Sequence, residues 1–168
     1  MPRRLLERCH PDSIREFRAA ARQRFDDAMT LAGRGRRTGA IYLWGYTVEM
    51  IIKAAYFALL GLAESDVITW NAHLLPAIQR GRALRIAWPG PGAGHNVRAW
   101  AELLIAARAL SPRASYTASF ALDVQRRGQR IGQLWRETLR YRRNHAHRYE
   151  MRYVHEAAEW FLVNSCDL

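Results

Sequence analysis

The sequence predicts an all-α protein, an up-and-down bundle of four to five helices within one domain that spans residues 1–168. Three observations favour this class. Apolar residues recur at spacings of three and four along several segments, which is the period of a helix that buries one face. No segment of any length shows the alternation of a half-buried strand. A length of 168 residues with 49% apolar and 24% charged residues is that of one ordinary globular domain.

Two long helices are expected in the first third of the chain. Ser13 is a residue type that caps helices, and apolar residues follow it at helical spacing over residues 14–31. The run 33–39 is rich in glycine and arginine and is expected as a loop. Residues 40–60 then form a helix that is apolar nearly all round, with Gly61 as its stop signal.

Three further helices are expected, over residues 73–80, 96–110 and 151–162. Asn96 is the cap of the second of these, and a continuous apolar stripe marks the last. Residues 113–140 stay ambiguous because two glycines, Gly128 and Gly132, interrupt a weak helical pattern.

The helix over residues 40–60 carries polar groups at its centre. It is long enough to cross a bilayer, but Glu49 and Lys53 lie at its middle, where each would cost about 2.5–3.5 kcal/mol. We therefore expect a buried core helix. Tyr42, Tyr46 and Tyr56 fall on the same stripe, so these polar tips need hydrogen-bond partners inside the fold or in a dimer seam.

The net charge of +11 is carried almost wholly by arginine, since Lys53 is the one lysine. Residues 126–152 hold nine arginines against two glutamates, and residues 1–37 hold ten arginines against five acids. A concentrated basic segment is typical of a protein that binds a polyanion such as RNA. The alternatives are a solubilising face and a docking surface for an acidic protein.

The two cysteines, Cys9 and Cys166, have neither a CxxC arrangement nor metal-ligand spacing, so we expect free thiols in a reducing compartment. The first ten residues lack a long apolar stretch, and no signal peptide is expected. These features predict a soluble, cytoplasmic protein without a metal or other cofactor.

The segment 140–149 is the densest cluster of ionisable and aromatic groups in the chain. His145 and His147 are two residues apart and cannot share a helix face, which makes them a poor metal-binding pair. Imidazole beside guanidinium suits metal-free RNA cleavage, because histidine can transfer protons and arginine can stabilise charge on a phosphate. The alternative is that these side chains are simply solvated.

Two segments of the chain resemble the HEPN family. Arg142 and His147, with four residues between them and Tyr149 after them, are similar to its Arg-x4-6-His motif, including the tyrosine of the toxin half of HEPN–MNT toxin–antitoxin pairs. The run from Tyr42 to Ala54 resembles the Tyr-Leu-x-Gly-Tyr-x-x-Glu-x-x-x-Lys-Ala pattern of the family's first long helices.

Smaller elements extend the likeness over residues 40–162, in the right order, with residues 1–37 as a basic N-terminal helix and loop. His73-Leu74-Leu75 resembles the family's His-x-Leu, and Trp135 with Arg140-Tyr141 is similar to an element found late in one branch that often lacks the catalytic histidine. The motif also has alternative registers, Arg140 with His145 and Arg140 with His147.

The resemblance implies a homodimer that cleaves RNA without a metal and leaves a 2′,3′-cyclic phosphate. His147 would be the acid or base, Arg142 would hold the phosphate, and Asn144 would orient one of them. Tyr149 would be the regulatory residue that a nucleotidyltransferase antitoxin modifies. The expected RNA-binding arginines are Arg126, Arg127, Arg130, Arg136, Arg143 and Arg148.

Two readings of this cluster stay open. The chain is either a ribonuclease of the toxin–antitoxin or RNA-processing kind, or a non-catalytic HEPN module that binds nucleic acid, a nucleotide or a nucleotidyltransferase partner. In the second case His147, four residues before Met151 and seven before Val154, can serve as a packing residue at the start of the last helix.

Overall fold

The computed structural model describes residues 10–88, 93–111 and 116–168, and over these residues every regular element is helical. The α-helices are α2 (Ile14–Gly33), α3 (Arg37–Leu59), α4 (Leu75–Ala83), α5 (Val97–Ala109), α6 (Ala118–Leu134) and α7 (Arg148–Val163). Three short turns accompany them, η1 (Trp70–Leu74), η2 (Ala93–His95) and η3 (Glu137–Tyr141). The all-α class is confirmed, with six α-helices in the described residues rather than four or five.

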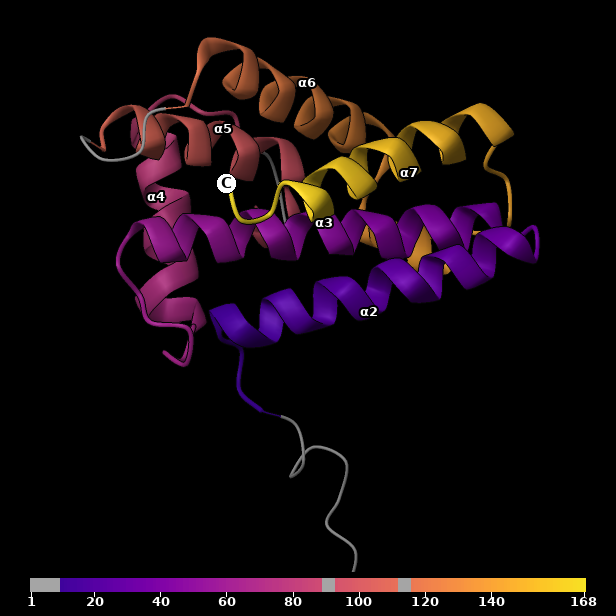
Figure 1. Ribbon diagram of the computed structural model, residues 1–168, viewed down its shortest axis with the longest axis horizontal. Coiled ribbons are helices and arrows are strands. Elements are labelled where there is room, and N and C mark those ends of the chain that lie inside the picture. The colour runs from indigo at the N-terminus through magenta and orange to yellow at the C-terminus, as the bar shows by residue number, and fades with distance from the viewer. Residues whose placement is uncertain (1–9, 89–92, 112–115) are drawn as a thin grey trace, which may run out of the picture.

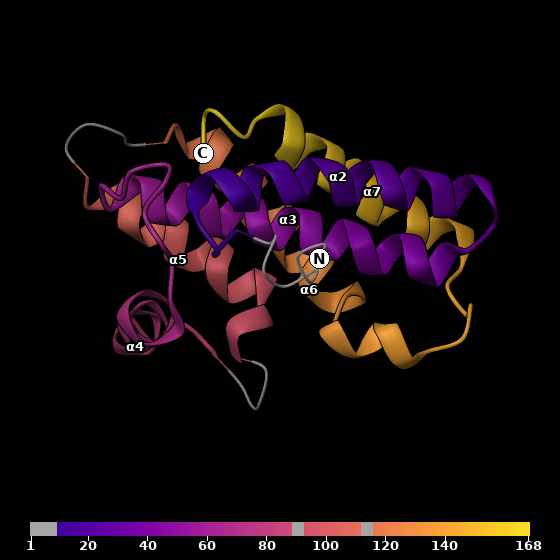
Figure 2. The same ribbon diagram turned by 90° about the horizontal axis from the view of Figure 1, so that it is seen from below.

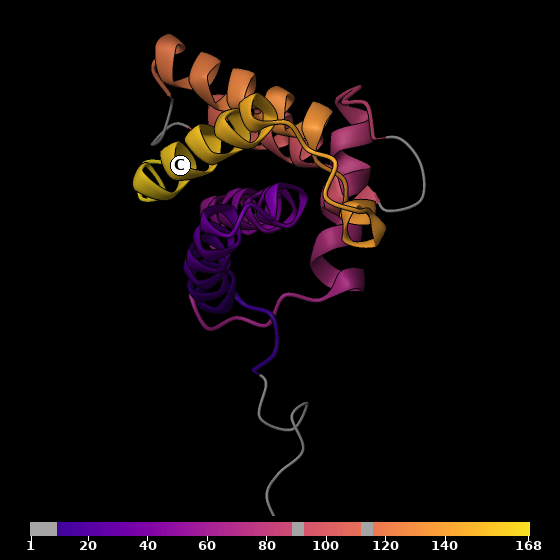
Figure 3. The same cartoon turned by 90° about the vertical axis from the view of Figure 1, so that its right-hand side faces the viewer.

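Helix α3 is the centre of the arrangement. It runs antiparallel to α2, and its other sides contact α5, α7 and η3 (Figure 1). Helix α6 packs on both α5 and α7, so the end view of Figure 3 shows the α2–α3 pair on one side and α5, α6 and α7 on the other. Helix α4 runs across the long helices and is seen end-on in Figure 2.

The core gathers around α3 because that helix is apolar on almost every side. Trp44, Tyr56 and Phe57 of α3 are fully buried, as are Trp100 of α5 and Phe161 of α7. In the part of the chain that the structure describes, no helix combines the length and the apolar character needed to cross a membrane.

Local capping signals set where several helices begin. The Ser13 hydroxyl accepts a hydrogen bond from the Glu16 N–H at 3.2 Å, and the Asn96 side chain accepts one from the Ala99 N–H at 3.1 Å. These bonds satisfy N–H groups that lack a partner in the first helical turn. The starts predicted for residues 14 and 97 are therefore confirmed.

The ambiguous segment 113–140 contains a complete helix, α6, in which the glycines have a packing role. A Cβ on Gly128 would lie 2.6 Å from the Ala101 Cβ, and one on Gly132 would lie 2.9 Å from the Arg98 Cβ. Glycine thus lets α6 approach α5 closely. The gain in packing offsets the helix propensity that glycine lacks, about 1 kcal/mol per residue.

Candidate functional site

The loop between η3 and α7 is fastened to the start of α3. The Thr38 hydroxyl, in a buried residue, accepts hydrogen bonds from the backbone N–H groups of His145 (2.9 Å) and Ala146 (3.0 Å). The Asn144 side chain accepts from the Thr38 N–H at 3.1 Å and donates to the Gly35 carbonyl at 2.8 Å. Four hydrogen bonds therefore fix this loop to Gly35 and Thr38, which precede it by more than a hundred residues in the sequence.

This anchored loop forms one wall of an open pocket of about 390 Å³, which we call the loop hollow. Its polar lining residues are Thr38, Arg142, Arg143, His145, His147 and Glu150. The side chains of Arg142, Arg143, His145 and His147 are all exposed. Two arginines and two histidines thus line one hollow, a combination that suits the binding of a phosphate beside groups that can carry protons.

Both the backbone and the ring of His147 make contacts with neighbouring residues. It is the N-cap residue of α7, and its backbone N–H donates to the Glu150 carboxylate at 2.6 Å. Its ring stacks on that of Tyr149, with the centroids 5.6 Å apart and the planes at 6°. The side chain is exposed and does not pack inside the bundle.

Arg140, the arginine of the alternative registers, lies against tyrosines instead of in the hollow. Its guanidinium is 4.7 Å from the ring centroid of Tyr141, and it does not line the loop hollow. The charges of Tyr141 and, more weakly, Tyr42 raise the pKa of Arg140 above its ordinary value. The register of Arg142 with His147 is therefore the one in which both members meet at a single pocket.

The predicted RNA-binding arginines fall into three groups. Arg127 and Arg130 of α6 lie over aromatic rings of α7, with Arg127 4.9 Å from Trp160 and Arg130 5.4 Å from Tyr153. Arg136 donates to the backbone carbonyls of Gly132 and Trp135. The remaining three, Arg126, Arg143 and Arg148, are exposed.

Exposed tyrosines accompany these arginines. Tyr141, Tyr149 and Tyr153 expose 74%, 55% and 39% of their surface. Aromatic rings and guanidinium planes that reach solvent are the groups on which unpaired RNA bases stack. The surface of α7 and the loop before it thus combines charge for phosphates with flat groups for bases.

The polar stripe of α3 finds its partners inside the fold. Glu49 and Lys53 are 3% and 6% exposed, and the Lys53 Nζ lies 2.5 Å from the Glu49 Oε1. The His95 Nδ1 is 3.0 Å from the Glu49 Oε2. Burial, with a hydrogen bond to Tyr42, raises the pKa of the Tyr46 phenol well above its ordinary value.

The sequence had not singled out His95, because nothing in residues 93–97 indicates that they return to the middle of α3.

Among the described residues, no three of histidine, cysteine, aspartate and glutamate gather closely enough to hold a metal ion. Cys166 is an exposed free thiol, and Cys9 lies outside the described residues.

Removing the side chain of Asn144 should loosen the loop without unfolding the domain. We expect Asn144→Ala to lower the free energy of unfolding by about 1–2 kcal/mol, since two hydrogen bonds are lost at an exposed site. Limited proteolysis should then cut the loop over residues 142–147 faster than in the wild type. A cleavage rate at this loop equal to that of the wild type would show that the two bonds do not anchor it.

Comparisons with known proteins give no match: no family model, no curated protein and no solved structure is significantly similar to the chain.

Proposed function

We propose that the protein binds RNA and cleaves it, without a metal, at the loop hollow. The observation that carries this proposal is the meeting of Arg142, Arg143, His145 and His147 at one exposed pocket of about 390 Å³. The motif resemblance to HEPN ribonucleases and the basic, tyrosine-rich surface around the hollow support it. In this proposal the chain is a HEPN protein of the toxin–antitoxin or RNA-processing kind.

The proposed reaction is an internal transesterification. An imidazole takes the proton of a ribose 2′-hydroxyl, the 2′-oxygen attacks the adjacent phosphorus, and the bond from phosphorus to the 5′-oxygen breaks. A second imidazole gives that leaving oxygen a proton, which yields a 2′,3′-cyclic phosphate and a 5′-hydroxyl. Arg142 and Arg143 hold the phosphate oxygens while negative charge builds on them.

The two imidazoles have two candidate sources. His147 and His145 of one chain line the same hollow, and the family resemblance favours His147 of two chains across a two-fold axis. The role of Asn144 is then to position the loop, since its side chain bonds to the backbone of Gly35 and Thr38. Tyr149, exposed beside His147, is the residue proposed for modification by a nucleotidyltransferase antitoxin.

A specific observation also favours the non-catalytic module. His147 already has a local task, since it begins α7 and stacks on Tyr149. A protein that only binds RNA needs the arginines and tyrosines of this surface and no proton transfer. Binding and cleavage must therefore be measured separately.

The test is to incubate labelled RNA with the protein in the presence of EDTA and to identify the ends of any product. Fragments that end in a 2′,3′-cyclic phosphate, lost with Arg142→Ala, are the expected result. RNA binding that weakens steeply with salt, but without products, would leave the binding module as the function. The absence of both RNA binding and RNA cleavage would contradict both proposed functions.

A further inference from the structure

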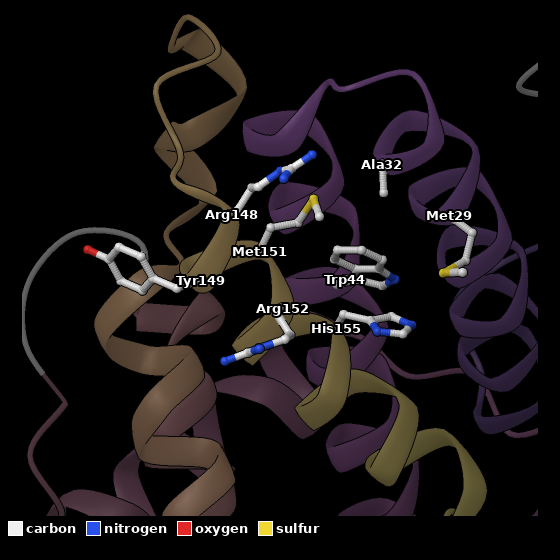
Figure 4. A pocket seen from close by; sticks show the side chains of 8 residues that line it. All are labelled: Met29, Ala32, Trp44, Arg148, Tyr149, Met151, Arg152 and His155. Atoms are coloured by element: carbon white, nitrogen blue, oxygen red, sulfur yellow. The ribbon is translucent and has the colours of Figure 1, made fainter.

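A second pocket lies on the other side of the first turns of α7. Its volume is about 560 Å³, within the range of small-molecule sites. Figure 4 shows the indole of Trp44 and the imidazole of His155 next to each other, between Met151 of α7 and Met29 of α2. We call this space the tryptophan pocket.

The tryptophan pocket contains a buried donor without a partner. Trp44 is 1% exposed, and its indole N–H has no hydrogen-bond acceptor among the described residues. Buried N–H groups in folded proteins nearly always have an acceptor. The half-buried His155 ring lies 4.8 Å from the indole, centroid to centroid.

The charged residues that line the tryptophan pocket are both positive. Arg148 and Arg152 line it, and none of the described lining residues is acidic. In Figure 4 Arg148 extends from α7 towards the turn between α2 and α3, whereas the side chain of Arg152 is directed away. Arg152 also has Glu156 within 3.7 Å, so Arg148 is the cation placed to meet a ligand at the mouth.

From these groups we propose that the tryptophan pocket binds a small, flat aromatic carboxylate. The ring system lies against Met29, Trp44 and Met151, whose surfaces are apolar and polarisable. A ring atom of the ligand accepts a hydrogen bond from the Trp44 N–H. The carboxylate of the ligand pairs with Arg148 at the mouth of the pocket. This assigns a ligand to a pocket that shares Arg148 and Tyr149 with the proposed RNA-binding surface but contains none of the groups proposed to cleave RNA.

The tryptophan pocket adjoins the loop hollow. The first turn of α7 contributes to both spaces, with His147 and Glu150 lining the hollow and Arg148 and Met151 lining the tryptophan pocket. Binding itself needs no RNA, so it can be tested whether or not the protein cleaves RNA.

The test is calorimetric titration with quinoline-6-carboxylate, whose ring nitrogen is an acceptor for the Trp44 N–H, and with its neutral analogue quinoline-6-carboxamide. We expect saturable binding at one site, with the carboxylate about tenfold tighter than the amide because it forms a charge-assisted bond. Arg148→Gln should bring the two affinities together, and Ala32→Phe, which fills the pocket, should abolish both. Arg126→Gln removes an exposed charge elsewhere and should change neither.

Methyl NMR locates the bound ligand. The chain has four methionines, of which Met29 and Met151 line the pocket, while Met50 packs against the core elsewhere. Quinoline-6-carboxylate should shift the methyl signals of Met29 and Met151 and leave that of Met50 in place. The proposal is overturned by the absence of saturable binding, by shifts confined to Met50 or Met1, or by equal losses of affinity in Arg148→Gln and Arg126→Gln.

Discussion

We expect His147→Ala to lower the rate of RNA cleavage by about 10²–10⁴-fold, the usual contribution of a general acid or base. RNA affinity should change little, because the charges that hold the phosphate belong to Arg142 and Arg143. Single-turnover cleavage at saturating protein measures the chemical step, and a filter-binding assay measures the affinity. A variant that cleaves at the wild-type rate would remove His147 from the chemistry.

A second variant separates chemistry from the structural task of His147. His147 is the N-cap residue of α7, a position at which asparagine is strongly favoured over alanine. His147→Asn should therefore keep the stability of α7 and still lose activity. His10→Ala removes an exposed imidazole that does not line the hollow, so it should cleave normally.

His145→Ala tests which imidazoles act together. If both imidazoles of one chain take part, this variant loses as much activity as His147→Ala. If His147 acts with its counterpart in a second copy, His145→Ala cleaves nearly as fast as the wild type. Loss in His145→Ala alone would favour the register of Arg140 with His145.

The largest effect on stability is expected at the buried ion pair of α3. Glu49→Leu leaves the Lys53 ammonium buried at 6% exposure without its carboxylate, and breaking such a pair lowers the free energy of unfolding by about 3–5 kcal/mol. His95 loses its hydrogen-bond partner in the same variant. Urea unfolding, monitored by circular dichroism, measures the change in the free energy of unfolding.

The double variant Glu49→Leu/Lys53→Leu is the matched control for this prediction. Apolar residues often replace a buried pair at no cost, so we expect the double variant to recover most of the lost stability. Asp27→Ala breaks the exposed pair with Arg24 and should cost at most about 1 kcal/mol. A Glu49→Leu variant as stable as Asp27→Ala would mean that the buried pair does not hold the core together.

The parts of the fold that could be predicted are those set by neighbours in sequence. Ser13 and Asn96 cap the helices that follow them, and these bonds reach only three residues along the chain. Helix α6 was ambiguous because Gly128 and Gly132 weaken the local pattern. These glycines allow α6 to pack closely against Ala101 and Arg98 of α5. The local sequence around them does not reveal that contact.

The candidate site divides in the same way. Residues 140–149 are consecutive, so their gathering could be predicted from the sequence alone. Thr38 fixes that loop from more than a hundred residues away, and no pattern around it indicated this role. The tryptophan pocket was likewise hidden, because its walls come from α2, α3 and α7.

The most direct measurement is photo-cross-linking of single-stranded RNA that carries 4-thiouridine, followed by mass spectrometry of the attached peptides. If RNA lies in the loop hollow, the cross-links should fall within residues 140–149 and on neighbouring side chains such as Tyr153 of α7. They should disappear in Arg142→Ala/Arg143→Ala, a variant that leaves the loop's anchors to Thr38 in place. Cross-links concentrated on α4, or unchanged in that variant, would contradict the assignment of the hollow as the RNA site.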